Sequence, residues 1–303
     1  MKKIVIALPR SWGSWELYKE YKTYRIMHIP VLLDEVIEYL NPQPGQKFID
    51  ATINGGGHAF AILERIVPGG KLLGIEWDRE LLKELKFKVQ SSKFKDNVIL
   101  AGDNYANLKK ITADNDFGNV QGVIFDLGMS SWHLEEAGGG FSFTKDEPLD
   151  MRFNRQAGNG QPTAAEIVNK YSERELIKIL KEYGEERFAK SIAGAIVKAR
   201  KEKPVTTTFQ LAEIIKNSTP FWYRRRRIHF ATKTFQALRI AVNDELENIE
   251  SGIKQTENVL KSGGRLAVIS FHSLEDRIIK NFFREESKKE KFKILTKKPI
   301  RAK

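Results

Sequence analysis

The alternation of strand-like and helix-like segments between residues 47 and 128 restricts this chain to one class of fold. Four short apolar runs predict strands, and helical periodicity follows each of the first three. The strands are expected at 47–51, 71–76, 98–101 and 120–127, and the helices at 58–67, 79–90 and 105–113. Repeated strand–helix–strand units predict an α/β fold, a doubly wound parallel sheet with helices on both faces. Further strands are expected at 265–271 and 292–295.

A helical insertion is predicted to interrupt the sheet. After Gly128 a glycine-rich loop leads into consecutive helical patterns, and Ser172 with Glu175 forms a capping box for one of them. Helices are expected at 172–184, 185–200 and 209–216, with a long one at 234–261. We therefore expect residues 135–232 to form an inserted helical domain, and residues 28–134 and 233–303 to form the sheet domain.

Residues 1–27 do not fit this pattern. They are rich in aromatic side chains and lack periodicity, so we treat them as an N-terminal extension and hypothesise that Met27 is the natural start. Mass spectrometry of the native protein tests this, because a peptide from residues 11–25 would refute it. The apolar stretch at 4–8 is shorter than the roughly 7–15 residues of a signal peptide, so a cytoplasmic protein is expected.

Positive charge is concentrated in two segments. The chain has 51 Lys and Arg against 39 Asp and Glu, and the excess lies at 187–233 and 280–303. Such segments suit a polyanion. The run Arg224, Arg225, Arg226 and Arg227 follows three aromatic residues, a combination that favours RNA or single strands. For the C-terminal lysines a solvated terminus is an equal alternative.

A nucleoside-type site is predicted where the first strands end. Asp50 is followed by the loop 54–58, Asn-Gly-Gly-Gly-His, which opens a helix, and Glu76 ends the next strand. Such glycines let a ligand approach backbone amides, and the acid can accept hydrogen bonds from ribose hydroxyls. Phe60 stands where the dinucleotide fingerprint needs its third glycine, which argues against NAD and for a mononucleoside such as S-adenosylmethionine. No phosphate-binding G-x-x-x-x-G-K-[ST] motif is present.

Polar residues follow the later strands as well. Asp103 and Tyr105 could form a wall for adenine, and Asp126 ends the fourth strand. A carboxylate there can accept a hydrogen bond from a substrate amine and from the ammonium group of the ligand. Asp126 is therefore the residue expected to take part in the reaction. The alternative is that it only forms the turn before Gly128.

Other candidates have competing structural explanations. The segment 270–276 suggests a hydrolase, but no G-x-S-x-G elbow exists, and Ser273 with Asp276 is explained as a helix cap. His272 could line the substrate pocket or be structural. Phe141 and Phe143 could stack on a flipped base or pin the insertion to the sheet. The chain has no Cys, and its five His include no H-E-x-x-H pair, so neither a thiolate nor a metal is expected.

Eight motifs, taken together, resemble the 16S rRNA cytosine-N4 methyltransferase family of the RsmH or MraW type. They are HIPVLLDE at 28–35, GGGH at 55–58, DLG at 126–128, GFSF at 140–143, PLDMR at 148–152, YGEERF at 183–188, FATKTFQALR at 230–239 and ISFHSLEDR at 269–277. The resemblance spans about residues 28–300. It implies a class I methyltransferase domain dependent on S-adenosylmethionine, with an inserted helical substrate-binding domain. The implied substrate is a cytidine N4 amine in the decoding region of the small ribosomal subunit.

Cofactor contacts carried over from this family fall on Gly56, Gly57, His58, Glu76, Tyr105, Asp126 and His133. The sequence departs from the family pattern at three positions. Glu76 stands where the family usually has Asp, His133 where it has Gln, and Gly139 where it has Arg before the GFSF loop. The family usually continues with an Asn-Pro-Arg-Ala-Arg-Ser segment, whereas this sequence stops at Lys303, which leads us to expect a shortened C-terminus.

Three rivals to this interpretation remain. A DNA cytosine methyltransferase typically carries [DNS]-P-P-[FYW] after the fourth strand, and the sequence at 126–129 is Asp-Leu-Gly-Met. A Rossmann oxidoreductase would bind NAD instead of S-adenosylmethionine. A catalytically inactive RNA-binding protein would keep the basic segments without turnover. The oligomeric state is left open by the sequence.

Overall fold

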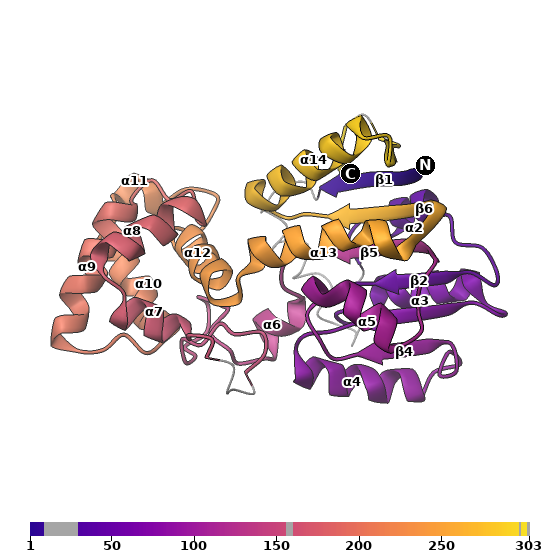
Figure 1. The fold of residues 1–303 in the computed structure, drawn as a ribbon. Helices are drawn as coiled ribbons and strands as arrows, with labels where there is room; N and C mark the ends of the chain where they lie inside the picture. Colours follow the sequence, from indigo (N-terminus) through magenta and orange to yellow (C-terminus); the bar gives the residue numbers. More distant parts are fainter. Residues whose placement is uncertain (9–29, 156–159, 297, 302–303) are drawn as a thin grey trace. The chain divides into compact units, whose positions relative to one another are not determined.

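The computed structural model describes residues 1–8, 30–155, 160–296 and 298–301. The chain divides into two compact units, which we call the sheet unit (residues 1–128 and 246–303) and the helical unit (residues 129–245). Figure 1 labels most of the helices and strands of both units. The α/β class and the helical insertion expected from the sequence are both confirmed.

The sheet unit is built on an eight-stranded sheet whose described strand pairs are all parallel. The strands are β1 (Lys2–Leu8), β2 (Lys47–Asp50), β3 (Lys71–Ile75), β4 (Val98–Ala101), β5 (Val120–Asp126), β6 (Leu260–Ile269), β7 (Phe292–Ile294) and β8 (Ile300–Arg301). Their order is β4-β3-β2-β5-β6-β1-β7, and β8 also pairs with β1. From β2 the chain builds outward to β3 and β4, and it then returns to place β5 on the other side of β2. The strand order therefore reverses between β2 and β5, where open α/β sheets bind ligands.

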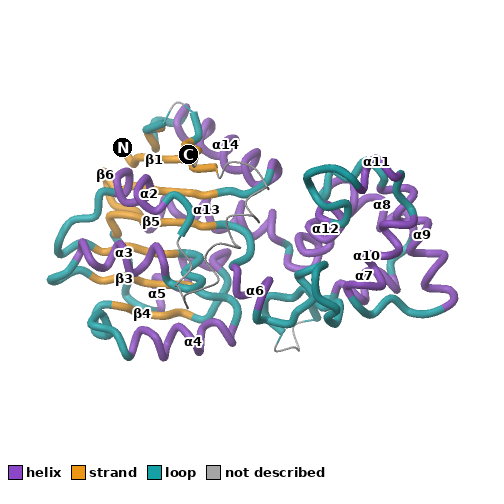
Figure 2. Tube along the Cα trace, turned by 180° about the vertical axis from the view of Figure 1, so that it is seen from behind, coloured by secondary structure: helices purple, strands orange, loops and turns teal. Residues whose placement is uncertain are grey.

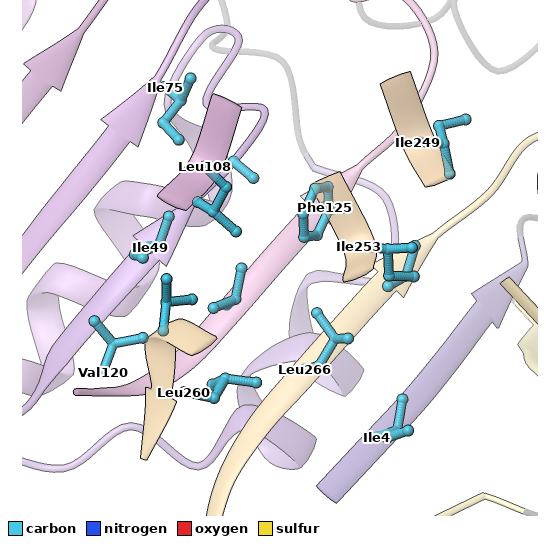
Figure 3. Close-up of a cluster of buried hydrophobic side chains, with 14 of the residues drawn as sticks. Ile4, Ile49, Ile75, Leu108, Val120, Phe125, Ile249, Ile253, Leu260 and Leu266 are labelled. Carbon is cyan, nitrogen blue, oxygen red and sulfur yellow. The ribbon is translucent and has the colours of Figure 1, made fainter. Parts of the chain in front are cut away.

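Helices cover both faces of the sheet. They are α2 (Leu33–Leu40), α3 (Gly57–Ile66), α4 (Arg79–Gln90), the short 3₁₀ helix η1 (Tyr105–Asn107), α5 (Leu108–Asp114), α13 (Glu245–Val259) and α14 (Ser273–Lys288). Figure 2 shows α2 and α3 over one face, whereas α5, α13 and α14 share a hydrophobic cluster with the strands on the other face. Figure 3 shows part of this cluster, in which Phe125 of β5 lies near Ile249 and Ile253 of α13. Burial of each such side chain stabilises the fold by about 1.5–3 kcal/mol.

The helical unit has its own hydrophobic core. Its helices are α6 (Ser131–Glu135), α7 (Ala164–Lys170), α8 (Glu173–Glu182), α9 (Ala189–Glu202), α10 (Thr208–Asn217), α11 (Phe221–Arg224) and α12 (Thr232–Asn243). Capping boxes begin α7, α8 and α10, and the one at Ser172 and Glu175 is the one expected from the sequence. Among the described helices none is both long and apolar enough to cross a membrane.

The helical unit is longer than the predicted insertion, running from 129 to 245 instead of 135 to 232. The reason is packing, because Phe235, Leu238 and Val242 of α12 are buried in the core of the helical unit. The single long helix expected at 234–261 is also wrong. Asp244 adopts a left-handed conformation (φ 48°) that ends α12, and residues 260–261 already belong to β6.

The strand β1 was not expected from the sequence, which left residues 1–27 as an extension. It pairs with β6 from Lys3↔Arg265 to Ala7↔Ile269 and with β7 at Lys2↔Phe292. The side chains of Ile4 and Val5 are buried. A short apolar run of this kind fits a buried strand. The hypothesis that Met27 is the natural start stays a prediction. Residues 9–27 lie outside the part of the chain that the structure describes.

Candidate functional site

The glycine-rich loop lies between the end of β2 and the start of α3. Asn54 and Gly56 have left-handed backbones (φ 47° and 83°), and the Gly56 amide donates to the Ile53 carbonyl at 2.7 Å. A Cβ on Gly57 would lie 2.3 Å from the Pro30 ring, so only glycine fits there, whereas a Cβ on Gly55 would have no neighbour within 4 Å. The loop is thus packed against the protein on one side and open at Gly55, as a ligand-binding backbone requires.

Glu76 lies across from this loop, directly after β3. Its Oε1 accepts from the Asp78 amide at 2.8 Å. Burial raises the pKa of Glu76 to about 8, opposed by backbone hydrogen bonds from Asp78, Asn54 and Trp77. The bond from Asn54 shows that the carboxyl group reaches the glycine loop itself. The side chain is therefore held at the edge of the loop, where the sequence predicted it.

Asp126 ends β5 at the switch in strand order, and Thr52 connects it to Asp50. The Asp126 amide donates to Thr52 Oγ1 at 2.6 Å, and the Thr52 amide donates to Asp50 Oδ1 at 3.2 Å. Burial raises the pKa of Asp126 to about 8, with repulsion from Asp50 and Glu275 adding to the effect. Burial also raises the pKa of Asp50 to about 7. The carboxyl groups of Asp50, Asp126 and Glu275 therefore lie close enough to interact at this end of the sheet.

The two side-chain oxygens of Asp126 differ in their surroundings. The side chain is 17% exposed, and Oδ2 lies 3.6 Å from His58 Nδ1. Oδ1 is buried, and within the described residues it has no hydrogen-bond partner. A buried carboxyl oxygen without a hydrogen-bond partner is costly, so this atom is available to bond to a group that enters the site. This is the strongest single indication of chemistry at the site.

His58 and Lys88 connect the glycine-rich loop to the protein around it. His58 is buried, and its Nε2 lies 3.0 Å from the Val31 carbonyl, so this nitrogen carries a proton and donates it. Lys88 donates from Nζ to the Gly55 carbonyl at 2.7 Å and lies 4.9 Å from the centre of the Phe60 ring. Phe60, which departs from the dinucleotide fingerprint, thus packs beneath the loop, where its ring approaches Gly56.

The two residues of the predicted adenine wall are held by other parts of the sheet unit. The ring of Tyr105 meets Phe125 edge-on at 5.6 Å and closely approaches Gly252 of α13. Asp103 accepts from the Asn104 amide at 2.7 Å and from the Asn107 side chain at 2.9 Å. The Tyr105 ring is therefore held against Phe125 and α13, and Asp103 shapes the turn before η1.

His272, and not Ser273, caps the helix α14, which corrects the prediction of a Ser273 cap. The ring Nδ1 of His272 accepts from the Glu275 amide at 3.4 Å, and Glu275 Oε2 accepts from the amides of Phe271 and His272 at 2.7 and 3.3 Å. Both side chains are buried. His272 therefore has the structural role that the sequence left open beside a place in the substrate pocket.

The remaining candidates belong to the helical unit. His133 is buried and its Nδ1 lies 2.8 Å from Ser130 Oγ. Phe141 stacks on Phe153 with ring centres 5.4 Å apart, and Phe143 stacks on His229 at 4.3 Å. Both phenylalanines thus have stacking partners within the helical unit itself.

Six of the seven predicted cofactor residues lie in the sheet unit, and His133 lies in the helical unit. Sequence reasoning did not select Asp50, Thr52, Lys88 or Glu275 for the site. Asp50 could have been found, since it ends the strand beside Asp126. No local sequence pattern could have assigned Lys88 to the site, because its hydrogen bond to Gly55 spans 33 residues of the chain.

The raised pKa values predict that the ligand-free protein loses stability as the pH rises. Asp50, Glu76 and Asp126 have folded-state pKa values of about 7, 8 and 8, against about 4 in an unfolded chain. Between about pH 4 and pH 8 the folded state therefore holds more protons than the unfolded state, so the free energy of unfolding falls with pH. We expect a lower Tm at pH 8 than at pH 5.5, and a smaller difference in Asp126→Asn. An equal fall in Tm for both proteins would contradict this.

Comparison with known proteins decides the family. Residues 25–303 match the model of the MraW methylase family. The chain belongs to this family. It is 49% identical over 259 residues to the ribosomal RNA small subunit methyltransferase H of Syntrophotalea carbinolica, covering 86% of this chain and 81% of that one. It is 46% identical over 275 residues to the protein of the same name from Persephonella marina, covering 91% and 92%.

Among solved structures, a putative rRNA methylase from Clostridium thermocellum is 21% identical with a TM-score of 0.30, covering 34% of this chain and 54% of that one. Membership of the MraW methylase family confirms the resemblance found in the sequence motifs.

Proposed function

We propose that this protein transfers a methyl group from S-adenosylmethionine to the N4 amine of a cytidine in the decoding region of 16S rRNA. The observation that carries the proposal is Asp126, whose buried Oδ1 has no partner among the described residues, placed at the strand switch of an MraW family member. The names of the curated relatives, which refer to the RNA of the small ribosomal subunit, support the substrate class.

The residues at this site fit S-adenosylmethionine. The open backbone at Gly55 suits the close approach of a nucleoside, and Glu76 can accept from ribose hydroxyls beside the loop. Asp50 and Asp126 place carboxyl groups where a cationic ligand gains most from them, since a nearby cation favours the ionised form. When bound, the cofactor supplies a methyl group on a positively charged sulfonium. Gly56, Gly57, His58, Tyr105 and His133 remain its other proposed contacts.

Asp126 is the proposed catalytic residue because of what cytosine chemistry requires. The lone pair of the exocyclic amine is delocalised into the ring, which makes the amine a poor nucleophile. A hydrogen bond from its N–H to Asp126 would help to localise that pair and hold the amine in line for transfer. The amine loses its proton once it is methylated, so no separate general base is needed beforehand.

The helical unit is the proposed RNA-binding part of the protein. Arg224, Arg225, Arg226 and Arg227 carry four positive charges at one end of α11 and in the turn that follows. Cations that neutralise phosphates release counterions, so binding weakens as salt increases. The arginine run is the better candidate for contact with the RNA substrate. The other candidates, Phe141, Phe143 and His272, already contact partners within the protein.

Changing all four arginines to Gln is expected to weaken rRNA binding and to flatten its salt dependence. The slope of log K against log salt should fall by about 0.7 for each phosphate that is no longer neutralised. The measurement is fluorescence anisotropy at several salt concentrations. A matched control removes four exposed lysines of the sheet unit (Lys83, Lys86, Lys93 and Lys95). An unchanged slope in the arginine variant would exclude the run from any role in phosphate binding.

The proposed function is tested by nucleoside mass spectrometry of small-subunit RNA from cells with and without the gene. We expect N4-methylcytidine at one decoding-region position in the first sample, its loss in the second, and its return when the purified protein and S-adenosylmethionine are added to the unmodified RNA. An identical modification pattern in the two samples, with no methyl transfer by the purified protein, would contradict the proposal.

A further inference from the structure

Two large aromatic side chains stand exposed next to each other on α11 of the helical unit. Phe221 is 61% exposed and Trp222 is 52% exposed, whereas the next residue, Tyr223, is buried. Exposed apolar rings that adjoin one another are costly in water and commonly mark a binding surface. The sequence showed three aromatic residues before the arginine run, and the structure leaves two of them available.

Arginine side chains lie against both exposed rings. The guanidinium carbon of Arg187 is 5.6 Å from the centre of the Trp222 ring. Those of Arg225 and Arg224 are 4.4 and 5.6 Å from the centre of the Phe221 ring. Such cation–π contacts hold the rings and the charges together in one surface. Arg187 comes from the loop before α9, so the surface joins two segments that are far apart in the sequence.

A buried hydrogen-bonded base supports this surface. The hydroxyl of Tyr223 donates to Glu186 Oε2 at 2.9 Å, and Glu186 Oε1 accepts from the Phe188 amide at 2.9 Å. Burial, together with the neighbouring Glu186, raises the pKa of Tyr223 well above its usual value. The Phe188 ring packs against both Trp222 and Tyr223, at 5.8 and 4.9 Å. The exposed rings are therefore placed before any ligand arrives, which lowers the entropy cost of binding.

We propose that Phe221, Trp222 and Arg187 form a stacking surface for unpaired bases of the RNA substrate. The proposal rests on the proposed function for the choice of RNA. Aromatic faces accept any base that is not paired, and adjacent cations contact the phosphates of the same strand. Arg187 and the run 224–227 supply five positive charges, while Glu186 is buried beneath them and bonded to Tyr223. This charge favours a nucleic acid strand, and the exposed rings favour one with free bases over a duplex.

The test compares single-stranded RNA with a base-paired RNA of the same length, using the purified full chain and fluorescence anisotropy. Changing Phe221 and Trp222 together to Ala should weaken single-strand binding about 5- to 30-fold, as expected for the loss of base stacking, with less than a twofold effect on the duplex. Because no charge is removed, the salt slope should stay at its wild-type value, unlike that of the arginine variant. Trp222→Phe should keep most of the affinity.

Phe209→Ala is the matched control. Phe209 lies near the start of α10 in the same unit and is 47% exposed, so its loss tests whether any exposed ring matters. Binding of single-stranded RNA equal to wild type in the double variant would overturn the proposal, and so would an equal loss for the duplex. Loss of binding to a polyglutamate peptide with RNA binding retained would assign the surface to an acidic protein and would also overturn it.

Methyl transfer to unmodified small-subunit RNA, measured in parallel, separates this proposal from the proposed function. If the wild-type protein transfers methyl groups and the double variant has no binding defect, the proposed function is supported and the proposed stacking surface is rejected. A single-strand binding defect in a protein that transfers no methyl group would support the surface and contradict the enzyme.

Discussion

Replacing Asp126 with Ala is expected to lower kcat for methyl transfer by about 100-fold or more, the usual scale for losing a positioned polar group that acts on a proton of the substrate. The variant removes the one buried carboxylate oxygen of this residue that has no hydrogen-bond partner among the described residues. It keeps the backbone bond from the Asp126 amide to Thr52, so the end of β5 should remain in place. Single-turnover kinetics with saturating RNA measures the effect.

RNA affinity should change less than twofold in the same variant, because phosphate binding is proposed for the helical unit. Asp96→Ala, an exposed aspartate in the turn before β4, is the control for loss of one negative charge from the sheet unit. An unchanged kcat in Asp126→Ala would reject the catalytic assignment. A loss confined to RNA affinity would move Asp126 from the chemistry to substrate binding.

Replacing Arg239 with Met is expected to lower the free energy of unfolding by about 3–5 kcal/mol, the cost of leaving one buried charge without its partner. Arg239 and Glu245 are both 5% exposed and form a two-bond ion pair, with Nε–Oε1 at 2.7 Å and Nη2–Oε2 at 2.9 Å. Urea unfolding followed by circular dichroism measures the loss.

The double variant Arg239→Met with Glu245→Leu distinguishes the pair from simple packing. Because burying two charges is itself costly, replacing both with apolar side chains should restore most of the stability lost in the single variant. A double variant as unstable as Arg239→Met would show that the pair is not the source of the effect.

The sheet was predictable because its central strands carry the signal within themselves. β2, β3 and β5 are short apolar runs bounded by turns, and burial on both faces of a parallel sheet demands this pattern. The edge strand β4 is also a short apolar run, although its residues are only partly buried. The helix break at Asp244 was not predictable in the same way. Nothing in the local periodicity marks a left-handed aspartate, and the ion pair between Arg239 and Glu245 across it appears only in three dimensions.

The candidate site also contains residues that the sequence could predict and residues that it could not. The glycine loop and Glu76 follow from their spacing along one strand–helix–strand unit, and Asp126 follows from its place at a strand end. Lys88 and Glu275 reach the site from helices whose sequence gives no reason to point there. Sequence also could not separate Tyr223 from Phe221 and Trp222, because burial of one ring among three neighbours depends on Glu186.

The position of β1 has a consequence for how this protein is made. β1 leaves the ribosome long before its hydrogen-bond partners β6 and β7, with Lys3 paired to Arg265 and Lys2 to Phe292. Contacts at such sequence separation slow folding. The sheet therefore cannot close around β1 until those later strands have been synthesised. During that interval both edges of the apolar strand are unpaired. Such a strand is prone to aggregate, and chaperones protect chains in this state.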